Sequence, residues 1–113
     1  MSKKIAVPVD DSGMLDAHFG HCKYFAIMTE ENAKIVTEEF MVPPPHEPGV
    51  LPDWLAKKGV TVIIAGGIGQ RAIDLFNQTG VDVLVGVQKL SAKELAESYV
   101  DGTLVASANY CDH

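Results

Sequence analysis

Apolar residues come in short blocks along the first third of the chain, and these blocks predict three strands. Residues 4–9 (KIAVPV) form an apolar run that stops at residues 10–13, a cluster of loop-forming residues. Residues 24–29 and 34–42 are β-prone, and the segment 30–33 (EENA) between them suits a hairpin turn. The first third therefore predicts a meander of three strands.

The second half contains two runs that are continuously apolar and rich in β-branched residues. They are residues 60–65 (VTVIIA) and residues 81–87 (VDVLVGV). Such runs are typical of strands that are buried on both faces of a sheet. Between the two halves, the prolines of residues 43–48 exclude both a helix and a central strand.

Helical periodicity and capping residues predict three helices, which start near Pro52, at Gln70 and at Ala92. The first has Pro52 near its first turn and ends at Gly59. The second runs to about residue 78, and the third to about residue 99. Ser91 and Glu94 form a capping-box pattern at the start of the third helix.

The resulting order is β-β-β-α-β-α-β-α, which indicates an α/β fold with a mixed five-stranded sheet and three helices. The strand–helix alternation in the second half implies right-handed parallel crossovers. We expect strands one, three, four and five to be parallel and strand two to be antiparallel to them. The order also predicts that residues 10–23, 43–49, 66–69 and 87–90 meet at one carboxyl edge, where open α/β sheets bind ligands.

Composition limits the function further. A chain of 113 residues with 47% hydrophobic content fits one domain with one core. The net charge of -6 argues against nucleic acid, and neither a polybasic patch nor a long apolar run predicts membrane binding. We expect a cytoplasmic protein in which residues 1–104 form the domain and residues 105–113 a flexible tail.

The stretch HFGHC places His18, His21 and Cys22 within five positions. Imidazole and thiolate together suit zinc, copper, or an iron–sulfur or mixed-metal cluster. The alternative is that His18 hydrogen-bonds its loop while Cys22 packs as a small buried hydrophobe. The residues alone leave both interpretations open.

Three more soft donors lie elsewhere: His46 in the proline-rich loop, and Cys111 and His113 in the tail. A disulfide between Cys22 and Cys111 does not suit a cytosolic protein. The ten residues that end at Cys111 span roughly 33 Å when extended, so the tail can reach the carboxyl edge. We expect it to be mobile without ligand and to close over the filled site.

The loop GGIG follows a strand and opens a helix. Residues 67–72 match G-x-G-x-x-A, but Gln88 and Lys89 stand where a dinucleotide-binding domain needs an acidic residue. We therefore reject nucleotide binding. Exposed N–H groups at a helix start favour any anion, so Gly66, Gly67, Gly69 and Arg71 are candidate anion-binding residues.

Catalytic patterns are weak. Asp10 and Asp11 end the first strand, but the partner position of a two-metal nuclease holds Ala65 and Gly66 instead of a carboxylate. Cys22 with a neighbouring histidine resembles a thiol nucleophile and base, yet no third group is available to orient the base. We expect a protein that is not an enzyme.

Five segments together carry a family resemblance: IAVPVDD, HFGHCKYFAI, LPDWLAKKGVTVIIAGGIGQRAIDLF, GVDVLVGV and YVDGTL. Over residues 5–104 the chain resembles the dinitrogenase iron–molybdenum cofactor biosynthesis family, the NifX/NafY-type domain that is also the C-terminal domain of NifB proteins. The resemblance implies a ribonuclease-H-like fold without nuclease activity. It also implies an anionic iron–molybdenum or iron–sulfur type cargo, with His18 as the leading ligand and the GGIG loop lining the pocket.

These observations predict a protein that binds or carries a metal–sulfur cluster or cofactor precursor, exchanged with cluster donor and acceptor proteins. A simpler alternative is a protein that binds or senses a single transition metal, zinc or copper, through Cys22 and the tail. A thiol-based redox enzyme is the third hypothesis.

Overall fold

The computed structural model describes residues 3–16, 19, 22–44 and 50–110. The described chain forms six strands and three helices. In chain order they are β1 (Lys3–Val9), β2 (Tyr24–Glu31), β3 (Lys34–Met41), α1 (Val50–Lys57), β4 (Val62–Ile64), α2 (Gln70–Gln78), β5 (Asp82–Val85), α3 (Ala92–Asp101) and β6 (Ala108–Tyr110).

All strands belong to one mixed sheet with the order β3-β2-β1-β4-β5-β6. β2 is antiparallel to both β1 and β3, whereas β1 pairs with β4, and β4 with β5, in parallel. β1, β3, β4 and β5 therefore point the same way, which confirms the predicted fold class and strand directions.

The five predicted strands are joined by a sixth in the segment that we expected to be flexible. Residues 108–110 pair antiparallel with β5, Val85 facing Ala108 and Val83 facing Tyr110. Three residues carry too little pattern to predict a strand, because such a short pairing depends on its tertiary surroundings. A smaller difference is that α1 begins at Val50, two residues before the predicted start at Pro52.

The turn between β2 and β3 is a two-residue loop. Asn32 and Ala33 both have positive φ angles, 53° and 63°, as a type I′ hairpin turn requires. Glu30 Oε2 accepts a hydrogen bond of 2.8 Å from the Ala33 backbone N–H. The predicted hairpin is thus confirmed. The backbone twist of a type I′ turn matches the right-handed twist of the two strands that it joins.

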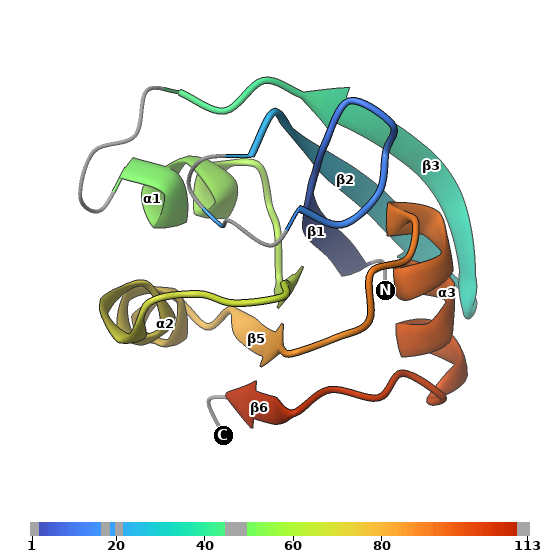
Figure 1. Ribbon diagram of the computed structural model, residues 1–113. Helices are drawn as coiled ribbons and strands as arrows, with labels where there is room; N and C mark the ends of the chain where they lie inside the picture. The colour runs from blue at the N-terminus through green and yellow to red at the C-terminus, as the bar shows by residue number, and fades with distance from the viewer. Residues whose placement is uncertain (1–2, 17–18, 20–21, 45–49, 111–113) are drawn as a thin grey trace.

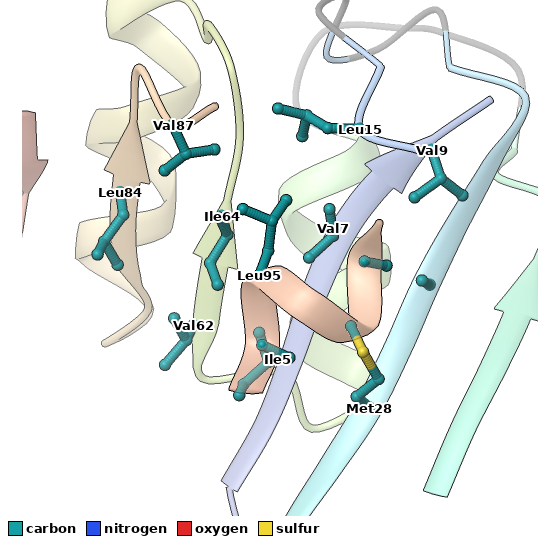
Figure 2. Packing of buried hydrophobic residues seen from close by; sticks show 13 residues of the cluster. Ile5, Val7, Val9, Leu15, Met28, Val62, Ile64, Leu84, Val87 and Leu95 are labelled. Atoms are coloured by element: carbon teal, nitrogen blue, oxygen red, sulfur yellow. The ribbon is translucent and has the colours of Figure 1, made fainter. Parts of the chain in front are cut away.

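Helices cover the sheet on both faces, with α1 and α2 on one and α3 on the other (Figure 1). Side chains alternate between the two faces, so Val7 and Ile64 pack toward α3, whereas Ala6 and Ile63 pack toward α1 and α2. Figure 2 shows Leu95 of α3 pointing between Val7 and Ile64. Burial on both faces of the sheet explains the continuously apolar runs at β4 and β5.

α3 begins with the predicted capping box. Ser91 Oγ accepts a hydrogen bond of 3.2 Å from Glu94 N–H, and Glu94 Oε1 accepts one of 3.4 Å from Ser91 N–H. The helix ends at Gly102, whose φ of 79° is the left-handed conformation that glycine adopts without strain.

A close approach of two backbones attaches β6 to the end of β5. Ser107 N–H donates to Val85 O at 2.9 Å, and Gly86 N–H donates to Gly66 O at 3.0 Å. Gly86 has a φ of +72°, and a Cβ at this position would overlap Ser107 Oγ. Only glycine therefore fits between β5 and the chain that leads into β6.

We predict that Gly86→Ala destabilises the protein more than Gly80→Ala does. Gly80 has a φ of +79° but open space around its missing Cβ, so alanine there adds only backbone strain of about 1–2 kcal/mol. Alanine at Gly86 adds an overlap that costs a further ~1–3 kcal/mol. Urea unfolding measures both costs, and amide hydrogen exchange of β6 should rise only in Gly86→Ala. Equal effects of the two substitutions would show that Ser107 does not approach Gly86 closely.

Candidate functional site

Four parallel strands end at one edge of the sheet, as predicted. The loops that follow β1, β4 and β5 leave from this carboxyl edge, and so does the chain after β3. In the sheet, β2 and β3 lie on one side of β1, and β4 lies on the other side of β1. The order reverses between β1 and β4, and such a switch point is where open α/β sheets leave a crevice for ligands.

A cavity of about 530 Å³ lies at this switch point. It is lined from β1 by the loop that follows it, from β4 by two glycines, and from β5 by the segment leading to α3. The lining residues are Asp10, Leu15, Asp16, Gly66, Gly67, Val87 and Lys89. We call it the edge cavity.

The loop after β1 is held by its own hydrogen bonds. Asp10 Oδ1 accepts from Ser12 N–H at 2.9 Å, from Ser12 Oγ–H at 2.7 Å and from Met14 N–H at 3.2 Å. Asp10 N–H donates to Met14 O at 2.9 Å, and Leu15 N–H donates to Leu90 O at 2.9 Å. These contacts fix one wall of the edge cavity to β1 and to the start of α3.

The same contacts keep Asp10 ionised by lowering the pKa of its carboxyl group below the ordinary value. The hydrogen bond from the Ser12 hydroxyl is the largest cause, and desolvation opposes it. The backbone N–H groups of Ser12 and Met14, and the positive charge of Lys89, lower the pKa further. The Asp10 carboxylate therefore stabilises the loop that carries it, and the positive charge of Lys89 is close enough to act on it.

The glycine loop forms the opposite wall. Gly66 is half-buried and Gly67 exposed, and both line the cavity. Gly69 is the N-cap of α2 and makes no side-chain capping bond, so no side chain closes the start of this helix. Arg71 is exposed in the first turn. The structure thus brings Gly66 and Gly67 to the cavity and Gly69 and Arg71 to the helix start beside them.

Leu15 and Phe19 pack on opposite faces of the sheet. Leu15 belongs to the core on the α3 side, whereas Phe19 packs on the other side. The Phe19 ring makes edge-to-face contacts with Phe25 and Phe76, with ring centroids 5.5 Å and 5.7 Å apart. Leu15 and Phe19 are therefore each anchored in a core.

Only one of the six predicted soft donors is described by the structure. Cys22 is 7% exposed and belongs to the apolar cluster beneath α1 and α2, as the buried-hydrophobe alternative expected. The other five lie outside the described residues: His18, His21, His46, Cys111 and His113. Within residues 3–16, 19, 22–44 and 50–110, no three His, Cys, Asp or Glu side chains are grouped as a metal site.

The direction of β6 bears on the predicted closure of the tail. β6 starts opposite Val85, at the carboxyl edge, and ends with Tyr110 opposite Val83. It therefore runs away from the edge cavity. The residues after Tyr110 lie outside the described residues, so closure of the tail over the filled site stays a prediction.

Comparison with known proteins identifies the family. The model of the family "Dinitrogenase iron-molybdenum cofactor" matches residues 1–102, which contain every element from β1 to α3. The chain belongs to this family. Protein MJ0580 of Methanocaldococcus jannaschii is 33% identical to it over 106 residues, with 89% of this chain and 88% of that protein covered.

Two solved structures share the fold. The crystal structure of PH0822 has a TM-score of 0.83 at 30% identity and covers 92% of this chain and 96% of its own. The apo form of the orange protein (ORP) from Desulfovibrio gigas has a TM-score of 0.76 at 23% identity and covers 94% and 93%. At that identity, the likeness to ORP concerns the fold alone.

Membership of the dinitrogenase iron–molybdenum cofactor family relates the chain to cofactor-associated proteins. Among the described residues, no helix has both the length and the apolar content to cross a membrane.

Three charged residues of the edge cavity, Asp10, Asp16 and Lys89, were not among the predicted site residues. A signal for Lys89 was present, because it follows a buried strand that ends at the carboxyl edge. Asp16 gave no such signal. Its place depends on the folded-back loop, where Asp16 N–H donates to Pro8 O at 2.9 Å.

We predict that Asp10→Asn loosens the loop after β1 in a pH-dependent way. Because the folded-state pKa of Asp10 is lowered, its ionised form stabilises the protein above the unfolded-state pKa, and this contribution is lost as the pH falls through the folded-state value. The wild type should thus exceed Asp10→Asn in stability near neutral pH, and the difference should close as the pH falls through the lowered folded-state pKa of Asp10. Urea unfolding across this range measures it. A difference that does not vary with pH would mean that the charge of Asp10 plays no part.

Proposed function

We propose that this protein binds and carries an anionic metal–sulfur cluster or cofactor precursor, of the iron–molybdenum or iron–sulfur type, in cofactor assembly or storage. The edge cavity is the binding site, and the cargo is exchanged with donor and acceptor proteins in the cytoplasm. The protein acts as a carrier and not as an enzyme. Family membership supports the class of cargo, and the observation that carries the proposal is the composition of the cavity.

Part of the cavity wall consists of backbone alone. Gly66 and Gly67 line the cavity without side chains, and α2 starts three residues after Gly67 without a side-chain cap. N–H groups at a helix start, with the helix dipole behind them, favour negative charge. Lys89, which also lines the cavity, adds a positive charge. At about 530 Å³, the volume is in the ~300–1,000 Å³ range of small-ligand sites.

Two carboxylates also line the cavity, and their charge must be reconciled with an anionic cargo. Asp10 directs its Oδ1 to three donors of its own loop, which compensate its charge locally. Lys89, whose charge acts on Asp10, offsets part of the negative charge of the two carboxylates. We propose that the cargo lies toward the glycine wall, away from Asp10.

We propose that His18 supplies a soft ligand for the cargo. His18 follows Asp16 by two residues and precedes the anchored Phe19, which supports His18 as the leading ligand. His21 is the second candidate. Cys22 is the weaker one because it packs in the apolar cluster, and His46, Cys111 and His113 rest on the sequence alone.

One observation favours a single metal ion instead. Asp16 lines the cavity next to the segment of His18, and carboxylate with imidazole is a common zinc donor set. The thiol-based redox enzyme gains nothing from the structure, since a buried cysteine in apolar surroundings is inert.

Metal and sulfide analysis of anaerobically purified protein distinguishes these functions. The proposal predicts iron or molybdenum together with acid-labile sulfide, and loss of both in His18→Ala without loss of the fold. Zinc or copper without sulfide would support the single-ion site. Protein that binds neither metal nor sulfide after reconstitution would contradict both.

We predict that Gly67→Asp weakens cluster binding by about tenfold or more, because a carboxylate enters the wall that faces the anion; tenfold corresponds to ~1.4 kcal/mol. Gly67→Ala is the matched control, because it adds side-chain volume without charge. Cluster affinity is measured after anaerobic reconstitution, with thermal unfolding alongside. If the two variants bind equally, the electrostatic part of the proposal is wrong.

A further inference from the structure

β3 is an edge strand with eight residues, and in the part of the chain that the structure describes it pairs only with β2. Its other edge therefore presents backbone N–H and C=O groups to solvent. Such an edge is a template for strand addition by another chain.

Exposed apolar side chains accompany this edge. The large hydrophobic residues that are most exposed among the described residues are Val36, Phe40, Val42 and Val105, and the first three lie on β3 or directly after it. They are 50%, 52% and 71% exposed, respectively. A partner strand along β3 would cover them.

An acidic cavity lies at each end of the edge. The cavity at the carboxyl end, of about 370 Å³, is lined by Asp10, Asp11, Ser12, Gly13, Tyr24 and Phe40. The carboxylate of Asp11 and the faces of the two aromatic rings each attract a cationic side chain. Lys23 approaches Asp11 at 3.8 Å, but both side chains are well exposed, so the pair is weak.

The cavity at the other end, of about 420 Å³, lies between β3 and α3. It is lined by Ala33, Lys34, Ile35, Glu97, Val100 and Asp101. Glu97 and Asp101 are one helical turn apart on α3. The positive charge of Lys34 balances one of these two carboxylates, so the cavity keeps a net negative charge. Each end of the β3 edge thus offers acidic groups beside apolar walls.

We propose that the β3 edge binds an extended basic segment of a partner protein by strand addition, with a lysine or arginine side chain in each of the two cavities. Ile35 and Phe40, which line the two cavities, are five residues apart on β3, or about 17 Å. Side chains on one face of a strand recur every second residue. The partner's two cations are therefore four or six residues apart, because a spacing of five would place them on opposite faces of the partner strand.

Charge selects this occupant over a second copy of the chain. Glu38 and Glu39 lie in the middle of β3, where an antiparallel copy would oppose them with its own carboxylates. The net charge of -6 adds long-range repulsion between copies. A basic segment meets attraction at the same positions.

The position of this surface connects it to the edge cavity. Asp10 lines both the edge cavity and the cavity beside Phe40. A partner on β3 would therefore touch the loop that forms a wall of the cargo site. This connection rests on the proposed function, whereas the binding of a basic segment does not.

The test uses blocked synthetic heptapeptides and the whole protein without cargo. The basic peptide Arg-Val-Thr-Val-Thr-Val-Arg should bind, and its counterpart with glutamate at both ends should not. Two further basic peptides carry N-methyl groups on the odd or on the even residues. One of them should lose binding, because strand addition uses the N–H groups of one peptide edge only. Equal binding of all basic peptides would overturn strand addition.

Protein variants locate the surface. Phe40→Ala and Asp101→Lys should each weaken the basic peptide about tenfold, judged from cation–π and charge-pair strengths. Asp74→Lys, an equal charge change on exposed α2, should leave binding within about twofold. If Asp74→Lys weakens binding as much as Asp101→Lys, the interaction is unspecific and the proposal fails. A concentration-dependent dimer that Phe40→Ala abolishes would assign the edge to a second copy and overturn the basic partner.

Discussion

The parallel pairing of β1 with β4 brings together two segments that lie more than fifty residues apart in the chain. Ile5 pairs with Val62 and Ala6 with Ile63, and all four side chains are at most 1% exposed. Burial on both faces lets this pair hold α3 on one side and α1 and α2 on the other. The same pairing separates the meander from the parallel half, so the crevice at the carboxyl edge is a direct consequence of the core.

The residues around that crevice owe their positions to local bonds as well as to topology. The glycine wall is the connection between a buried strand and a helix without a side-chain cap, whereas the facing loop is shaped by the Asp10 carboxylate. This division leaves one side of the cavity without side chains, close to a helix start, and another side whose polar groups stabilise the fold. It also makes Asp10 the common wall of two neighbouring cavities, which relates cargo binding to partner binding in space.

Most of the fold could be predicted because its elements are long, strongly patterned or capped. The runs at β4 and β5 predict buried strands by hydrophobicity alone, and Ser91 with Glu94 predicts the start of α3. β6 could not be predicted, because its three residues depend on the glycine-only contact between Gly86 and Ser107. At the site, Gly66 and Gly67 were predicted from their place after a strand. Asp16 was missed because the loop that carries it folds back through bonds that leave no periodic signal in the sequence.

The most direct measurement for the edge cavity is a backbone amide NMR spectrum of ¹⁵N-labelled protein, loaded anaerobically with iron and sulfide and then reduced. A paramagnetic cluster broadens the signals of nearby amides first. Binding at the edge cavity predicts that Gly66, Gly67 and Lys89 lose their signals while Lys34, Glu97 and Asp101 keep theirs. Broadening that begins at β3 and α3, or that spreads evenly over the chain, would contradict binding at the switch point.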